Sequence, residues 1–284
     1  MASDTPEETV RLTQQRNYPL EFYGRFVSQA TKGEFASVLQ AQMCPFTNAR
    51  CSKTRKSDPE QTIGSCMLGY QGSPLVVCPH RFLQGRQIFR DCVSLLAPCA
   101  QYVVIPEVSM PGGSVDYYLV GLTEARVVDF AGIEIQALDT TGSGGIWQAR
   151  EDLSHGELAD TYSYGINWKV TAKTILVQLL HKTASFEALG KKLVLVIQNE
   201  FAEYLDREFQ TTQLRPATQE DSVHFHIYCV AEFNNALQIV LHERRSTTLS
   251  GIERMLNVGR DTSILLDDVL SHIAAKLPGM PLGN

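Results

Sequence analysis

Residues 112–138 read GGSVDYYLVGLTEARVVDFAGIEIQAL, and this stretch sets our expectation for the fold class. Two runs rich in Val, Ile, Tyr and Phe, at 114–122 and 127–138, are separated by the short polar segment TEAR, which is typical of two strands joined by a turn. A third run, YVVIPEV at 102–108, precedes them across MPGG. The three runs predict a meander of three antiparallel strands.

Downstream of the meander, helical and strand-like patterns alternate. The glycine-rich loop TTGSGG at 140–145 is followed at 167–189 by apolar residues at helical spacing, which predict a long amphipathic helix. Further strands are expected at 191–198, 223–233 and 237–245, and further helices at 201–209 and 263–277. The predicted fold is α/β, with a mixed β-sheet flanked by helices.

The residues before the meander fall into two kinds. Residues 6–16, PEETVRLTQQR, begin with Pro and acidic residues, and residues 21–40 have apolar residues at helical spacing, so we expect one or two helices there. Residues 44–80 lack any sustained period and are rich in Cys, Gly, Pro and Ser. That composition predicts loops in which a bound metal ion replaces a hydrophobic core.

Composition and charge narrow the class of protein. No apolar run approaches the roughly 18 residues that span a bilayer, and MASDTPEETVRLTQQR lacks the apolar centre of a signal peptide, so we expect a cytoplasmic protein. Its seven cysteines should then be reduced, which favours metal ligation over disulfides. The net charge is −6, yet residues 41–90 hold seven basic residues against two acidic ones. This segment either presents a basic face to a polyanion or is a solvated basic loop.

Carboxylates in the meander form the first candidate site. Asp116 lies in the second predicted strand and Glu134 in the third, so antiparallel pairing would bring them side by side. Gln136 follows Glu134 by two residues and shares its sheet face, whereas Ile133 and Ile135 belong to the opposite, apolar face. Carboxylates brought from neighbouring strands to one point are what metal-dependent phosphodiester hydrolysis requires. The alternative is a polar pair on a solvent-exposed face.

Cysteines form the second candidate site. Four of them lie in the settings CPFTNARC, SCMLGY and VVCPHRF: Cys44, Cys51, Cys66 and Cys78. Four thiolates suit one tetrahedral zinc or iron ion, although the spacing includes no CxxC pair and does not fix the ligand set. Cys92 and Cys99 fall in or beside an apolar stretch and are interpreted first as buried core thiols. His80 is a further candidate ligand.

Three segments resemble the NotI-like restriction endonucleases, the group that includes EagI. They read GGSVDYYLV, GIEIQALDTTG and YSYGINWKVTAKTILVQLLHK, at 112–120, 132–142 and 162–182, and the resemblance extends from about Cys44 to Lys182. It implies a PD-(D/E)XK-like nuclease core and a type II enzyme that makes magnesium-dependent double-strand cuts by phosphodiester hydrolysis. It also implies a GC-rich palindromic DNA site, a homodimer, and a cognate DNA methyltransferase that protects host sites.

The resemblance assigns roles to the candidate residues. Asp116 and Glu134 would bind magnesium, and Gln136 would position the attacking water or the scissile phosphate. The wider PD-(D/E)XK superfamily has a lysine where this chain, like the NotI-like group, has glutamine. Because a neutral amide cannot supply that charge, Lys169 or Lys173 on the long predicted helix could supply it instead. NotI-like enzymes also hold iron in a four-cysteine site, which implies the same role for the four cysteines, with zinc as the alternative.

The expected organisation has three parts: an N-terminal helical segment over 1–40, a four-cysteine metal-binding module over 41–90 and the nuclease core over 91–284. Side chains able to contact bases or phosphates flank the cysteines or follow the carboxylates in the chain. The candidates are Arg50, Arg55, Arg81, Arg86, Gln148, Arg150, Lys169 and Lys173. Two other functions stay open, a non-catalytic sequence-specific DNA-binding protein and a nuclease of another defence or repair system.

Overall fold

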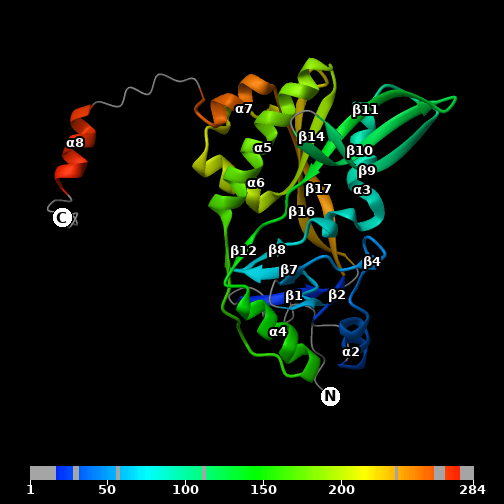
Figure 1. Ribbon diagram of the computed structural model, residues 1–284, viewed down its shortest axis with the longest axis vertical. Helices are drawn as coiled ribbons and strands as arrows, with labels where there is room; N and C mark the ends of the chain where they lie inside the picture. Colours follow the sequence, from blue (N-terminus) through cyan, green and yellow to red (C-terminus); the bar gives the residue numbers. More distant parts are fainter. Residues whose placement is uncertain are drawn as a thin grey trace.

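The largest element of the fold is a seven-stranded sheet with the order β15-β17-β16-β14-β11-β10-β9, in the upper half of Figure 1. The computed structural model describes residues 17–27, 32–55, 58–110, 113–233, 236–258 and 266–275. The strands of this sheet are β9 (Gln101–Met110), β10 (Gly113–Thr123), β11 (Arg126–Ile135), β14 (Lys192–Gln198), β15 (Arg215–Pro216), β16 (Val223–Phe233) and β17 (Ala236–Thr247). Strands β11, β14 and β16 are parallel and the other neighbours are antiparallel, so the predicted mixed sheet is confirmed.

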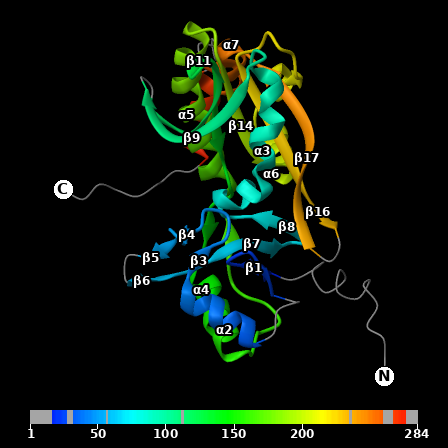
Figure 2. The same cartoon turned by 90° about the vertical axis from the view of Figure 1, so that its right-hand side faces the viewer.

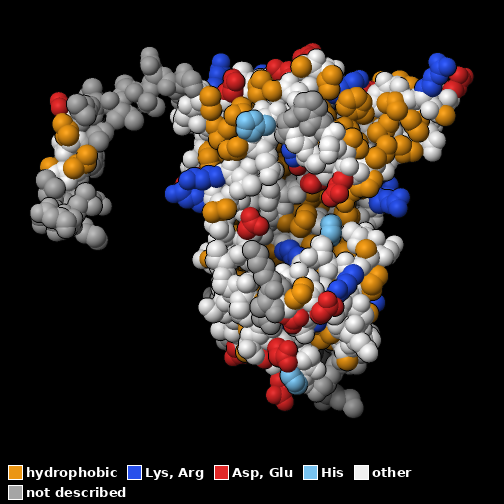
Figure 3. All heavy atoms as spheres, in the orientation of Figure 1, with side chains coloured by type: hydrophobic (Ala, Val, Ile, Leu, Met, Phe, Trp, Pro, Cys, Tyr) orange, Lys and Arg blue, Asp and Glu red, His pale blue; other side chains and the backbone are white. Residues whose placement is uncertain are grey.

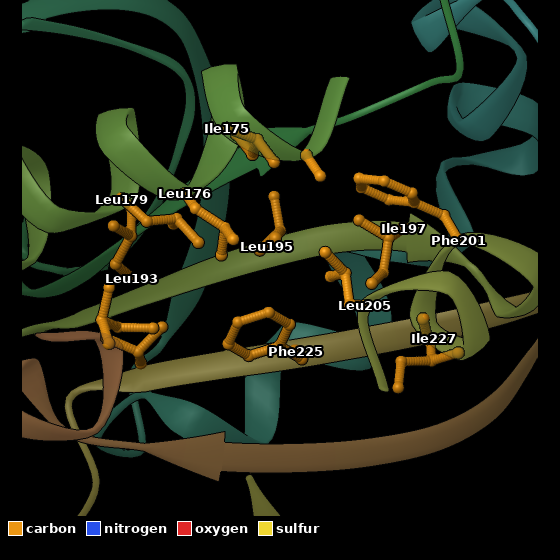
Figure 4. Packing of buried hydrophobic residues seen from close by; sticks show 14 of the residues in the cluster. Ile175, Leu176, Leu179, Leu193, Leu195, Ile197, Phe201, Leu205, Phe225 and Ile227 are labelled. Atoms are coloured by element: carbon orange, nitrogen blue, oxygen red, sulfur yellow. The ribbon is translucent and has the colours of Figure 1, made fainter. Parts of the chain in front are cut away.

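Helices cover both faces of this sheet, as predicted. One face packs against α5 (Trp168–Ala188), α6 (Asn199–Glu208) and α7 (Leu249–Met255). The other face packs against α3 (Gln87–Cys92) and the 3-10 turns η1 (Pro79–Arg86) and η2 (Val93–Leu95). Figure 4 shows Leu176 of α5 next to Leu195 of β14, and Leu179 of α5 next to Leu193 of β14. Strand β14 reads KLVLVIQ because a central parallel strand is covered on both faces.

A smaller antiparallel sheet lies below the large one in Figures 1 and 2. Its order is β2-β1-β7-β8, and α2 and α4 pack with it around a core that includes Phe22, Phe35 and Leu68. The bounds are β1 (Tyr18–Phe22), β2 (Arg25–Phe26), β7 (Ser65–Tyr70), β8 (Ser73–Val76), α2 (Lys32–Ala41) and α4 (Gly144–His155). Helix α4 follows β11 in the chain yet joins this lower part, which no local pattern had predicted.

The remaining elements are short. They are the strand pairs β3 (Met43–Cys44) with β4 (Ala49–Arg50), β5 (Thr54–Arg55) with β6 (Asp58–Thr62), and β12 (Thr140–Thr141) with β13 (Gly165–Ile166), the 3-10 turn η3 (Thr211–Gln213), and α8 (Leu266–Ala274). The last of these confirms the predicted C-terminal helix. None of the described helices is both long and apolar enough to cross a membrane.

Two predictions for the N-terminal part need correction. The helix expected over 21–40 is confirmed only from Lys32, where α2 begins, whereas Tyr18–Phe22 is a strand, because residues 19–22 are buried and pair with β7. Residues 44–80 were expected to lack a core, yet Met67, Leu68 and Val76 are fully buried on β7 and β8. The predicted helix at 6–16 lies outside the described residues.

The end of β8 joins the two sheets directly. The side chain of Gln198, at the end of β14, accepts a hydrogen bond from Val76 N at 2.7 Å and donates one to Pro74 O at 2.6 Å. The backbone N–H of Leu138 donates to Val76 O at 3.0 Å. These bonds fix the segment that carries the cysteines against the end of β11, where the candidate carboxylates lie.

Candidate active site

Asp116 and Glu134 face each other across neighbouring strands. The pairing of Tyr117 with Ile133 in the β10–β11 ladder puts Asp116 opposite Glu134. One carboxylate oxygen of Asp116 accepts a hydrogen bond from Ile135 N at 2.9 Å, and the backbone N–H of Asp116 donates to the Glu134 carboxylate. Asp116 is exposed and Glu134 is buried, so the pair lies at a point where the sheet meets solvent.

The Glu134 carboxylate is buried beside a second negative charge. Burial raises its pKa to about 7, and the Asp116 charge adds to this effect, while the Lys182 ammonium opposes it. Lys182 Nζ donates to Glu134 Oε1 at 2.7 Å. An isolated buried carboxylate costs several kcal/mol. This ion pair is therefore what makes a charged Glu134 tolerable inside the fold.

Gln136 extends the site along the same sheet face. Ile133 and Ile135 belong to the apolar cluster beneath α3, so Glu134 and Gln136 lie on the opposite face, as the alternation predicted. That face is the one toward α5, whose cluster includes Leu138. The backbone N–H of Gln136 donates to Val196 O at 2.9 Å, and its side-chain amide donates to Ala137 O at 2.6 Å. The Gln136 amide is thus held just beyond the end of β11, two residues after Glu134 on the same face.

Lys182 is the residue that sequence reasoning missed. Lys169 and Lys173, the lysines considered for the missing charge, are exposed on α5, whereas Lys182 lies on its buried face. The signal was present in the sequence, because helical spacing puts Lys182 in one stripe with Leu179 and Phe186, where an apolar residue is expected. The ion-pair partner of Lys182 and its burial are evident only from the folded structure.

A comparison with protein families identifies the family of the chain. The family model of the restriction endonuclease NotI matches residues 30–238, well over half of the chain, and this range includes both carboxylates, Gln136 and Lys182. The chain belongs to the NotI restriction endonuclease family. It is therefore a type II site-specific restriction endonuclease, a hydrolase that binds double-stranded DNA, which confirms the family and the activity predicted from the sequence. No curated protein sequence matches the chain.

The four cysteines of this NotI-family chain come from four places in the lower part. Cys44 ends β3, Cys51 follows β4, Cys66 lies in β7 and Cys78 follows β8. All but Cys51 are buried. Burial raises the pKa of the Cys66 thiol, and the charges of Cys78 and Cys44 raise it further. Burial likewise raises the pKa of Cys78, and the charges of Cys51 and Cys44 raise this pKa further. Cys78 therefore lies within electrostatic reach of Cys44, Cys51 and Cys66, and Cys66 also lies within reach of Cys44.

Cys44 differs from the other thiols in its hydrogen bonds. Burial would raise its pKa, but hydrogen bonds from His80, Thr47 and backbone N–H groups lower the pKa to about 7. His80, the alternative ligand, is thus a partner of Cys44. Cys92 is buried as predicted, whereas Cys99 is only partly buried. Across the described part of the chain, no group of three or more His, Cys, Asp or Glu is placed to hold a metal ion, so the predicted four-cysteine metal module is not shown.

The candidate DNA contacts divide by exposure. Exposed side chains are those of Arg50, Arg86, Gln148, Lys169 and Lys173. Arg55 lies in β5, but its side chain is outside the described part of the chain. Arg81 and Arg150 are buried.

Arg81 has protein partners for its guanidinium group. It donates to Glu21 at 2.7 Å, to Gln84 at 2.6 Å and to Leu237 O at 2.7 Å, and it is 1% exposed. Arg150 hydrogen-bonds to Tyr23 and lies over the Trp147 ring. Since neither guanidinium reaches the surface, the sequence prediction that both contact DNA is not supported by their positions.

Proposed function

We propose that this NotI-family enzyme cuts both strands of DNA by magnesium-dependent phosphodiester hydrolysis, with Asp116 and Glu134 as the metal ligands and Gln136 beside them. In this proposal the three residues form a PD-(D/E)XK-like site with glutamine in place of lysine. The observation that supports it best is the cross-strand pair of carboxylates, one exposed and one buried. A magnesium ion is commonly bound by one or two carboxylates together with substrate phosphates and water, and this donor set fits that chemistry.

Each residue has a stated task in this proposal. A bound magnesium ion polarises the scissile phosphate and promotes formation of the attacking hydroxide. Asp116 accepts a hydrogen bond from Ile135 N at one carboxylate oxygen, and its other oxygen would bind the ion. Glu134 is held at Oε1 by Lys182, which orients its second oxygen. Gln136, a neutral amide, orients water or phosphate through hydrogen bonds alone.

One digest tests the proposal against its alternatives. Purified enzyme is incubated with a long DNA over a magnesium titration, with EDTA as the control. Discrete fragments that require magnesium are expected, and sequencing their ends gives the recognition site, for which we propose a GC-rich palindrome. Smeared products would instead indicate a nuclease of another system. Intact DNA at every magnesium concentration would indicate a non-catalytic DNA-binding protein.

We also propose that the enzyme acts as a homodimer on its palindrome, because one carboxylate pair per chain must serve two DNA strands. Apolar side chains exposed on the strands of the meander support a protein interface there: Ile105 and Val108 on β9, and Val127 and Val128 on β11. Figure 3 shows hydrophobic side chains gathered at the upper right, over strands β9 to β11. Light scattering after size-exclusion chromatography should give twice the chain mass, and a monomeric mass would reject the dimer.

A cognate DNA methyltransferase is the partner that such an enzyme requires, since its own host DNA contains the site. We propose that methylation of the recognition sequence blocks cleavage. Once the site is mapped, synthetic duplexes with and without a methylated base at each position test this directly. Equal cleavage of every methylated duplex would contradict it.

For the four cysteines we propose a structural iron or zinc ion, held apart from the catalytic magnesium. Support comes from the electrostatic interactions of Cys78 with Cys44, Cys51 and Cys66, and from the burial of Cys44, Cys66 and Cys78. Four thiolates leave no open position for substrate, so the role would be structural.

For DNA contacts we retain Arg50, Arg55, Arg86, Gln148, Lys169 and Lys173.

A further inference from the structure

The buried face of α5 contains one charged residue. Ala172, Ile175, Leu176 and Leu179 precede it on this face, and Phe186 follows; all five are at most 2% exposed. Lys182 takes the next position in the same stripe and is 6% exposed. An apolar residue at this position would continue the packing of the helix on the sheet. The lysine therefore needs a reason other than packing.

Stability does not supply that reason. Removing a charge pair from a protein interior in favour of well-packed apolar residues is often neutral or stabilising, because desolvation offsets the attraction between the charges. The pair of Lys182 with Glu134 is such a pair, with side chains 8% and 5% exposed. The presence of this ion pair is better explained by a role of the two charges beside Asp116 in the proposed active site.

The pair lies where the cleavage site lacks a positive charge. Asp116 and Glu134 contribute two carboxylates, Gln136 contributes a neutral amide, and Asp116 forms no ion pair with any described residue. The Lys182 ammonium contacts Glu134 on the side of α5, while the backbone N–H of Asp116 contacts the same carboxylate from β10. Glu134 is thus fixed between a helix and a strand.

We propose that Lys182 is a positioning residue for DNA cleavage: it holds the Glu134 carboxylate toward Asp116 and supplies from α5 the positive charge that Gln136 does not. This inference rests on the proposed function, because it takes Asp116 and Glu134 as the metal ligands. It places the lysine of the site on a helix, 46 residues after Gln136 in the sequence. Partners of metal ligands typically change activity or metal affinity by about 10- to 100-fold when removed.

The test compares Lys182→Met, Lys182→Gln and Lys182→Arg in single-turnover cleavage of a DNA that the parent cuts. Two quantities are read, the amplitude, which reports the folded and competent fraction, and the rate constant at saturating magnesium. Lys182→Gln retains a hydrogen-bond donor without charge, and we expect its rate constant to fall about 10- to 100-fold at full amplitude. Lys182→Arg retains the charge and should recover most of the rate. Lys182→Met should be at least as slow as Lys182→Gln.

The control is Lys191→Met. Lys191 forms an ion pair with Asp129 at 2.7 Å. Asp129 lies on the same strand as Glu134 but away from Asp116, so removing the Lys191 charge should not change the rate constant. A parental rate constant in Lys182→Gln, or a loss of amplitude alone in all three variants, would overturn the inference. If Lys182→Met does not fold, the Gln and Arg variants still decide. Parental cleavage by Asp116→Asn would overturn the proposed function itself, whereas an inactive Asp116→Asn with a parental Lys182→Gln overturns only the role of Lys182.

Discussion

The Nζ atom of Lys182 lies 2.7 Å from Oε1 of Glu134, and both side chains are more than nine-tenths buried. The pair ties α5 to β11 and leaves Asp116, the opposite carboxylate, as the exposed member of the site. Both carboxylates are proposed to bind the same ion. Because they differ in burial, we expect their substitution to have different effects on the stability of the protein.

Asp116→Asn and Glu134→Gln should both abolish cleavage with DNA binding largely intact, because each removes a proposed metal ligand without removing bulk. Their stabilities should differ. Asp116→Asn should change the free energy of unfolding by no more than about 0.5 kcal/mol, as for most exposed positions. Glu134→Gln leaves the Lys182 charge uncompensated and should lose about 3–5 kcal/mol. Cleavage rates, fluorescence anisotropy with labelled duplex and urea unfolding measure these effects, and a parental cleavage rate in either variant would retire the assignment.

Gln136 should contribute through orientation and not through charge. Gln136→Ala should slow cleavage by about 10²-fold, the loss of one positioning hydrogen bond, with little change in magnesium affinity. Gln136→Glu adds a third carboxylate and should tighten metal binding and shift preference toward manganese. Partial activity of Gln136→Lys would show that lysine and glutamine can serve the same site. Single-turnover rates over magnesium and manganese titrations give these values, and Gln136→Ala cutting as fast as the parent would make Gln136 a bystander.

Freshly purified enzyme should contain about one iron or zinc ion per chain by elemental analysis. Cys44→Ser and Cys66→Ser should lose that ion, whereas Cys229→Ser should keep it, because Cys229 lies in β16 of the large sheet. Metal-free parent protein would refute the structural ion. Metal that persists in both variants would show that other residues hold it.

Arg81 and Arg86 should behave in opposite ways. Removing Arg81 leaves Glu21 as a buried unpaired charge, so Arg81→Met should lose about 3–5 kcal/mol of stability. Arg86 is exposed, and Arg86→Ala should leave stability nearly unchanged while weakening DNA binding. Urea unfolding and binding titrations at two salt concentrations distinguish the two. Equal stability of the variants would contradict the structural role of Arg81.

Acid should destabilise the enzyme through two buried histidines of β16. Burial lowers the pKa of His226 to about 3 and lowers the pKa of His224, and both lie below the unfolded value of about 6.5. As the pH falls below about 6.5 the unfolded chain takes up protons that the native state does not, so stability falls by at most about 1.4 kcal/mol per pH unit for each histidine. Urea unfolding between pH 7.5 and 5 measures this slope. His226→Leu should reduce it and His155→Gln, at an exposed position, should not; an unchanged slope in His226→Leu would exclude His226 as its source.

Local patterns in the sequence carried much of the fold. The meander, α5, α6 and strands β14, β16 and β17 follow from alternation and helical spacing, which neighbouring residues produce by themselves. The same alternation put Glu134 and Gln136 on one face of β11. Strand β1 and helix α4 could not be predicted from local patterns, because the elements they pack against, β7 and α2, lie far from them in the sequence. Likewise the buried residues of β7 and β8 gave no periodic signal for a core between 44 and 80.

The sequence alone determined the family, the fold class and the cross-strand carboxylates Asp116 and Glu134, since these depend on short motifs and on residues paired within one meander. Only the tertiary structure decided that Lys182 forms an ion pair with Glu134 and that the Arg81 guanidinium is buried and cannot contact DNA. The physical reason is the same for both residues. Whether a charged side chain faces solvent or a partner depends on groups that come from distant parts of the chain, Glu134 48 residues from Lys182 and Glu21 60 residues from Arg81.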